Sequence, residues 1–109
     1  MNALAPINAA QLPRCLTNGS TRQGWVYCIR DDASGTVKIG FSKNPERRFR
    51  QIQTSFPFKL RLIATIPAVE AFEQFLHWSH ASRRLTGEWF DDADGSVSNL
   101  FALTASEGF

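Results

Sequence analysis

Residues 40–49 read Gly-Phe-Ser-Lys-Asn-Pro-Glu-Arg-Arg-Phe, a stretch that indicates where a strand ends and a helix begins. Asn44 is a favourable N-cap, Pro45 suits the first helical position, and Glu46 complements the positive end of the helix dipole. The pattern predicts a helix over Pro45–Thr54. Its first turns carry adjacent arginines, whose planar guanidinium groups bind phosphate through paired hydrogen bonds. Because a solvated basic surface has the same composition, the flanking sequence decides between the two interpretations.

The segment before this helix predicts a β-hairpin. Residues 24–30 and 36–41 are rich in aromatic and β-branched side chains and are separated by turn-forming residues. Because side chains alternate along a strand, a turn between these runs places Tyr27 and Lys38 on one face, as direct or diagonal neighbours. Gly40 has no Cβ, so a backbone or ligand could approach closely at the strand end.

The rest of the chain predicts one more strand and two more helices. The strand covers Phe58–Ile66 and ends at Pro67, and one of its faces carries Leu60, Leu62 and Ala64. A helix over Ala68–Ala81 follows, and a last helix runs from residue 95 or 96 to Ala105. The predicted fold is of the α+β type within the broad α/β class. It contains a small three-stranded, mostly antiparallel sheet flanked by helices, in the order β-β-α-β-α-(α).

Length and composition predict one domain. The chain has 109 residues, of which 43% are hydrophobic and 12% aromatic, a globular composition. We expect residues 1–22 to form a flexible or loosely docked arm and residues 23–109 to form the domain. The arm reads neither as a signal peptide nor as a membrane span. Two cysteines are too few for a disulfide framework, so a cytoplasmic location is the default expectation.

Charge is distributed unevenly along the chain, although the net charge is only +2. Six basic residues and one acidic residue lie between Lys43 and Arg61, whereas six acidic and two basic residues lie between Glu70 and Asp94. Such an arrangement suits an enzyme that grips a polyanion and also holds a cation. On the helix over Ala68–Ala81, the four-residue spacing of Glu73 and His77 puts a carboxylate and an imidazole on one face.

Several separated motifs resemble one known family. The first two are Trp25-Val26-Tyr27 and Lys38-Ile39-Gly40, and downstream come Glu73-x-x-Leu76-His77, Arg84 and Gly87-Glu88-Trp89-Phe90. Together they resemble the GIY-YIG endonuclease superfamily, in particular its small phage, bacterial and fungal branch of the meiotically up-regulated-gene type. The first motif keeps only its tyrosine, and lysine replaces the tyrosine of the second.

The resemblance implies a GIY-YIG endonuclease-like fold and a divalent-metal-dependent endonuclease that hydrolyses DNA phosphodiester bonds. The implied catalytic residues are Tyr27, Lys38, Arg48 and Glu73. Glu73 would hold one Mg²⁺ or Mn²⁺ ion, and Arg48 would stabilise the transition state. The general base would be Tyr27, its pKa lowered by Lys38 and the metal, or Lys38 itself, unless Lys38 only contacts phosphate.

DNA is the expected partner, with no membrane involved. Contacts to the DNA backbone are expected from Lys43, Arg47, Arg50 and Arg61, and further candidate site residues are Gly40 and His77. DNA specificity would come from a separate DNA-binding partner or from a homodimer, or would be low. The main alternative is a nucleic-acid-binding module of the same fold without catalytic activity; a protein-interaction domain would explain the aromatic content but not the arginines.

Overall fold

A computed structural model describes residues 19–107, so most of the predicted arm, residues 1–18, lies outside the described residues. Five strands, three α-helices and one 3-10 turn form within the described range. In chain order they are β1 (Gln23–Asp31), β2 (Thr36–Ser42), α2 (Pro45–Thr54), β3 (Arg61–Val69), α3 (Glu70–Ser79), the turn at Ala81–Arg83, β4 (Arg84–Thr86), β5 (Trp89–Asp91) and α4 (Ser96–Ser106). No helix in this range is long and apolar enough to cross a membrane.

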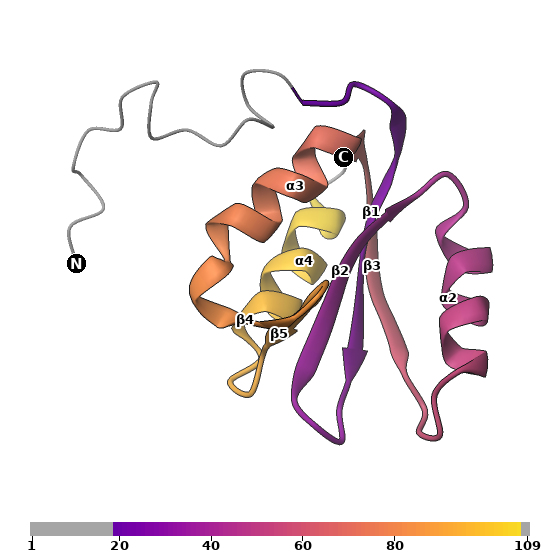
Figure 1. Cartoon of the computed structure of the whole chain (residues 1–109), viewed down its shortest axis with the longest axis vertical. Coiled ribbons are helices and arrows are strands. Elements are labelled where there is room, and N and C mark those ends of the chain that lie inside the picture. The colour runs from indigo at the N-terminus through magenta and orange to yellow at the C-terminus, as the bar shows by residue number, and fades with distance from the viewer. Residues whose placement is uncertain (1–18, 108–109) are drawn as a thin grey trace.

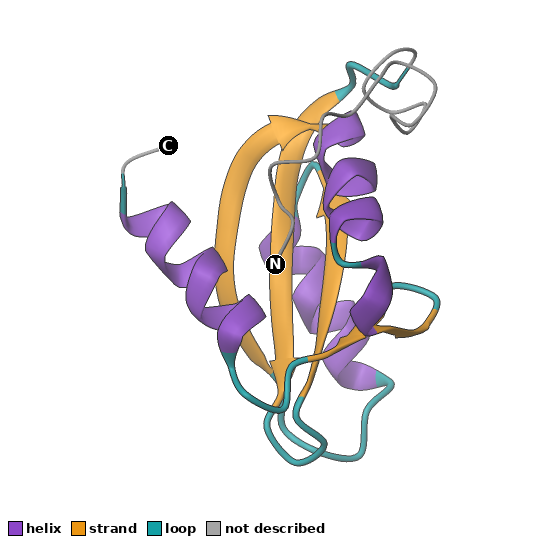
Figure 2. Cartoon of the chain, turned by 90° about the vertical axis from the view of Figure 1, so that its left-hand side faces the viewer, coloured by secondary structure: helices purple, strands orange, loops and turns teal. Residues whose placement is uncertain are grey.

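The strands form one antiparallel sheet in the order β3-β1-β2-β5-β4. Helix α2 covers one face, and α3 and α4 cover the other, which faces the viewer in Figure 2 (Figures 1 and 2). The α+β class is confirmed, but the prediction of three strands was wrong. Strands β4 and β5 have only three residues each and flank a turn at Gly87, too short for a periodic pattern to be recognised.

The hairpin and the arginine helix form where the sequence predicts them. Tyr27 pairs with Gly40 and the next residue on the same face, Ile29, pairs with Lys38, so Tyr27 and Lys38 are diagonal neighbours. At the start of α2, the Asn44 side chain accepts a hydrogen bond from the Arg47 backbone N–H at 3.1 Å.

Strand β3 differs from its prediction in three respects. It begins at Arg61 and not at Phe58. Pro67 lies inside the strand and does not end it, because β3 is at the edge of the sheet, where a missing N–H breaks no ladder. A β-bulge also shifts the pairing with β1, so that Ala64 lies opposite Cys28 and Leu62 opposite Ile29. The extra residue, Ile63, moves Leu62 and Ala64 to opposite faces, contrary to the alternation predicted for them.

Helix α3 begins at Glu70, two residues later than predicted, because β3 continues to Val69. Its first N–H groups are satisfied by backbone, since Glu70 N donates to Arg22 O at 2.8 Å and Ala71 N to Ser20 O at 2.9 Å. The end of the predicted arm is therefore fastened to α3. The helix ends at Ser79, two residues before the predicted Ala81, and Arg84 belongs to β4.

Each face of the sheet has its own core. Under α3 and α4, the larger cluster contains Val26, Cys28, Val37, Ile39, Ala64, Ile66, Leu76, Phe90, Val97 and Phe101. Under α2, the smaller cluster contains Tyr27, Ile29 and Leu60, with Phe49, Ile52, Phe56, Leu62 and Trp89 packed against it. Tyr27 is thus a buried member of the core on the α2 side, 1% exposed, and its hydroxyl points along the sheet toward Gly40.

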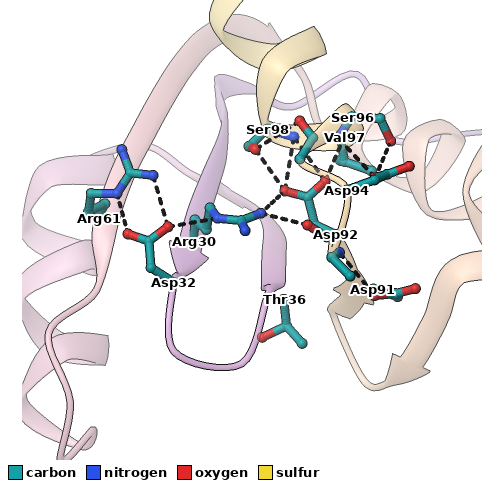
Figure 3. A network of polar contacts seen from close by, with 12 residues as sticks. Arg30, Asp32, Thr36, Arg61, Asp91, Asp92, Asp94, Ser96, Val97 and Ser98 are labelled. Carbon is teal, nitrogen blue, oxygen red and sulfur yellow. Dashed lines mark hydrogen bonds and ion pairs between the residues drawn. The ribbon is translucent and has the colours of Figure 1, made fainter.

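A charged network, which we call the Arg30 network, joins the hairpin to β3 and α4 (Figure 3). It consists of Arg30, Asp32, Arg61, Asp92 and Ser98. The Arg30 guanidinium bonds the carboxylates of both Asp32 and Asp92. Asp92 is fully buried, and it also accepts from Val97 N and Ser98 Oγ, each at 2.7 Å, at the start of α4. Gly95 is the N-cap residue of α4, and the Asp94 carboxylate accepts from Ser96 N at 3.0 Å.

Candidate active site

An edge of β2 lies open beside α3. Strand β5 pairs with β2 only from Thr36 to Lys38, and within the described range no strand continues this pairing. The last link is Ile39, whose N–H donates to Glu88 O at 3.0 Å and whose carbonyl accepts from His77 Nε2 at 2.7 Å. Side chains from both faces of the sheet can therefore meet around this edge.

Tyr27 reaches the edge because Gly40 leaves room for it. A Cβ on Gly40 would lie 2.2 Å from the Tyr27 hydroxyl oxygen and 2.3 Å from Cζ, so the ring crosses the glycine directly. What approaches Gly40 closely is the ring of Tyr27. Burial raises the pKa of Tyr27 above its usual 10, and the neighbouring Arg48 side chain opposes this shift. Without a bound cation, burial therefore outweighs the nearby positive charge.

Two carboxylates come together at the same edge. Lys38 Nζ donates to Glu88 Oε1 at 2.7 Å. Glu73, whose side chain is 12% exposed, lies beside Glu88. Burial, with the charge of Glu88 next in importance, raises the pKa of Glu73 to about 7, and Lys38 counteracts this only in part. Two carboxylates therefore share a partly dry environment, and Lys38 forms a short ion pair with one of them, Glu88.

His77 is held by the backbone of β2. Because a carbonyl oxygen only accepts, the hydrogen bond to Ile39 requires the proton on Nε2. Glu73 Oε2 lies 3.8 Å from the same nitrogen, and the ring packs edge-on against Phe90. His77 thus connects α3 to the strand edge and keeps the Glu73 carboxylate beside it.

The cluster has the chemistry of a divalent-cation site. Ligand atoms of Glu73, His77 and Glu88 all lie within 4.8 Å of one another. Nε2 of His77 donates its hydrogen to a carbonyl, so the two carboxylates remain as metal ligands. Oxygen ligands suit hard cations such as Mg²⁺ or Mn²⁺. A cation between them would also offset the charge repulsion that raises the pKa of Glu73.

Most sequence-predicted site residues meet at this edge, and we call Tyr27, Lys38, Arg48, Glu73, His77 and Glu88 the candidate active site. Lys43, Arg47 and Arg50 are exposed on α2 and the loop before it. Arg61 does not join them. It lies at the turn end of the hairpin, where its Nε and Nη2 contact Asp32 at 2.5 and 2.9 Å.

Sequence reasoning missed Glu88 as a site residue. Its neighbours Trp89 and Phe90 pack on the two cores of the sheet. In the sequence, Glu88 is recognisable only as a single acidic residue between Gly87 and Trp89. Its ion pair with Lys38 depends on the strand register that pairs Trp89 with Lys38. Only the folded sheet brings Glu88 to Lys38 and Glu73.

Comparison with known proteins gives one match. A model of the T5orf172 domain matches residues 24–103, which covers β1 to the middle of α4. This is a different family from the GIY-YIG superfamily, so the motif resemblance led to the wrong family. Neither the curated proteins nor the solved structures give a significant match.

Proposed function

Because the chain belongs to the T5orf172 domain family, a nuclease-like and DNA-binding family, we propose that it is a divalent-metal-dependent endonuclease acting on DNA. The observation that carries the proposal is the pair of carboxylates that lie together at the open edge of β2, next to a buried tyrosine, a lysine and an arginine. Phosphodiester hydrolysis needs stabilisation of the charge that builds on the phosphate oxygens and the leaving oxygen. The site offers cationic groups for that charge and oxygen ligands for a cation.

Each residue has a defined role in the proposed reaction. Glu73 and Glu88 would hold one Mg²⁺ or Mn²⁺ ion, which would supply Lewis-acid polarisation of the phosphate. Arg48 binds the phosphate oxygens and stabilises their charge in the transition state. Lys38, through its ion pair, positions the Glu88 carboxylate. His77 fixes Glu73 against β2.

Tyr27 orients the attacking water. Without a bound cation its raised pKa keeps the hydroxyl protonated and able to donate a hydrogen bond, and a cation held by the neighbouring carboxylates would favour transfer of the water's proton to the tyrosinate. Lys38 is a poor candidate for the base because its amine already donates to Glu88. DNA backbone contacts outside the site are assigned to Lys43, Arg47 and Arg50.

A nicking assay on supercoiled plasmid tests the proposal. We expect nicking with Mg²⁺ or Mn²⁺ and none with EDTA. Glu73→Gln and Arg48→Met should each lower the single-turnover rate by about 10²–10³-fold. The matched control is Arg61→Met. It removes an equivalent charge at the turn end of the hairpin, away from the site, and should leave the single-turnover rate unchanged. Equal losses for Arg48→Met and Arg61→Met would contradict the assigned site.

The second candidate is a nucleic-acid-binding module without catalytic activity, favoured by the Lys38–Glu88 ion pair. In that pair the Lys38 amine provides the carboxylates with one positive charge that a metal ion would otherwise provide. Binding that weakens steeply with salt, without nicking under any divalent cation, would establish this candidate over the first.

A further inference from the structure

We propose that a groove between α2 and β5 binds one nucleobase, unpaired from its complement, of the strand whose phosphate lies at the candidate active site. The inference rests on the proposed function and names the form of DNA that the site takes. The groove has a volume of about 370 Å³, within the range of small-ligand clefts (~300–1,000 Å³). Its lining residues are Lys38, Arg48, Gln51, Ile52, Ser55, Phe56 and Trp89.

The apolar part of the groove is suited to a flat ring. Phe56 and Trp89 lie with ring centroids 5.3 Å apart and planes inclined by 34°, and both side chains are half-buried. Their inner sides pack on the core under α2. Because one side of each ring is held by the core and another side lines the groove, these residues provide a rigid surface on which a base can stack without ordering a loop.

The polar part of the groove offers hydrogen bonds to the edge of a base. Gln51 and Ser55 are one helical turn apart, which places them on the same side of α2 and its C-cap, and both are exposed. The Gln51 amide carries both donors and an acceptor, and its oxygen makes only a 3.5 Å contact with Arg48. Such an amide can pair with the edge of a nucleobase.

The groove is connected to the candidate active site through two shared cations. Lys38 and Arg48 both line the groove. Lys38 also donates to Glu88, and the Arg48 side chain lies next to the Tyr27 hydroxyl. Lys38 Nζ lies 6.0 Å from the centre of the Trp89 ring. A phosphate bound by these cations therefore brings its attached nucleoside to the mouth of the groove. There the cations meet the charge of the phosphate and the aromatic side chains meet the flat base.

The occupant must be unpaired because a base inside a duplex is covered on both faces by its neighbours. Stacking on Phe56 or Trp89 requires one face to be free, and hydrogen bonding to Gln51 requires a free edge. Extruding a base from duplex DNA costs energy that is smallest when the base is already single-stranded or mismatched. We therefore infer a preference for single-stranded or frayed DNA over intact duplex.

Binding measurements in EDTA test this inference without relying on cleavage. The probe is a short oligothymidylate, with a series in which each base in turn is replaced by an abasic site. We expect the single strand to bind about tenfold more tightly than the same sequence as a duplex. Loss of one particular base should weaken binding by roughly five- to a hundredfold, the usual effect of one stacked base.

A double-variant comparison assigns the effect to the groove. In Trp89→Leu, the abasic substitution should have almost no further effect, whereas in Trp25→Leu, which changes an exposed tryptophan outside the groove, it should keep its full effect. Gln51 is exposed on the helix surface, so Gln51→Ala should not disturb folding. The variant should bind the intact strand more weakly but should bind the strand with the critical abasic site as the wild type does.

The outcomes separate this inference from the proposed function. Base-dependent binding without any nicking would leave the groove standing and overturn the nuclease. Nicking combined with equal affinities for the intact and abasic strands would overturn the groove alone. Equal affinity for duplex and single strand in the wild-type chain would also overturn it.

Discussion

The Arg30 network and the candidate active site both gather acidic and basic side chains, but they differ in how the charges are matched. In the Arg30 network, two arginines face two aspartates, and the buried Asp92 accepts hydrogen bonds from Arg30, Val97 and Ser98. In the candidate active site, Glu73 and Glu88 lie together and only Lys38 is ion-paired with them at short range. Each carboxylate of the first cluster has an arginine partner, whereas Glu73 in the second has no ion pair with a lysine or arginine among the described residues.

The pKa values follow this difference. Hydrogen bonds from Arg61 and Arg30 lower the pKa of Asp32 to about 2, whereas burial and Glu88 raise that of Glu73 to about 7. A structural ion pair favours the ionised form of a carboxylate. In a site that binds a cation or substrate, burial and a second carboxylate disfavour the ionised form until the ligand is bound. The comparison teaches that the sign of the pKa shift, more than the number of charged residues, distinguishes a stabilising cluster from a candidate functional one.

The largest effect is expected from Asp92→Asn, which breaks the Arg30 network. It leaves the partly buried Arg30 guanidinium with only the exposed carboxylate of Asp32 and weakens the bonds to the start of α4. The free energy of unfolding should fall by about 3–5 kcal/mol, as for other broken buried pairs. Urea denaturation measures the change. The control is Asp32→Asn, an exposed partner of the same arginine, and a loss there as large as that of Asp92→Asn would refute the distinction between the two aspartates.

The two clusters should respond to pH in opposite directions. Because the folded-state pKa of Glu73 is about 7, above its usual 4.5, its contribution to stability is fully present below pH 4.5 and is lost as pH rises through 7. Without divalent cations, the free energy of unfolding should fall on the order of 2–3 kcal/mol between pH 5 and 8. Asp32 has a lowered pKa, so its contribution is present above pH 3.8 and is lost as pH falls through about 2.

Thermal unfolding of the wild type and Glu73→Gln across pH 5 to 8 checks this prediction. The variant should lose most of the slope, and Mn²⁺ should raise the stability of the wild type at pH 8 more than at pH 5, since the ion binds the ionised carboxylate. A slope that Glu73→Gln leaves unchanged would show that another group causes it.

Gly40→Ala tests whether the position of Tyr27 depends on this glycine. The added Cβ would lie far inside contact distance of the Tyr27 ring, so we expect a loss of about 1–3 kcal/mol, as for other overpacked sites. Combined with Tyr27→Ala, the same substitution should have little further effect, because the obstructing ring is gone. Additive losses in the double variant would contradict the close approach.

The smallest effect is expected from Lys38→Met, which removes one of the two cationic side chains of the candidate active site. Lys38 lowers the pKa of Glu73, so its removal should raise that pKa further. The rise should be about one unit or less, because a partly exposed ion pair contributes about 1 kcal/mol or less. Carboxyl NMR titration of Glu73 measures it, with Arg61→Met as the control that should leave the value in place. A fall would mean that Lys38 does not act on this carboxylate.

Local sequence determined the hairpin and α2 because the decisive interactions connect residues close in the chain. Asn44 caps the helix through Arg47, three residues later, and alternation along two joined strands puts Tyr27 and Lys38 on one face. The four-residue spacing of Glu73 and His77 likewise places both on one side of α3. These features follow from helical and strand periodicity alone.

Tertiary structure decided the parts that depend on pairing between distant segments. The bulge at Ile63, the inclusion of Pro67 in an edge strand, and the short β4 and β5 all depend on which strand lies next to which. The Lys38–Glu88 pair spans 50 residues and the Arg30–Asp92 pair 62. Sequence patterns report local periodicity and charge, whereas the balance of charge within each cluster exists only after the sheet has brought those residues together.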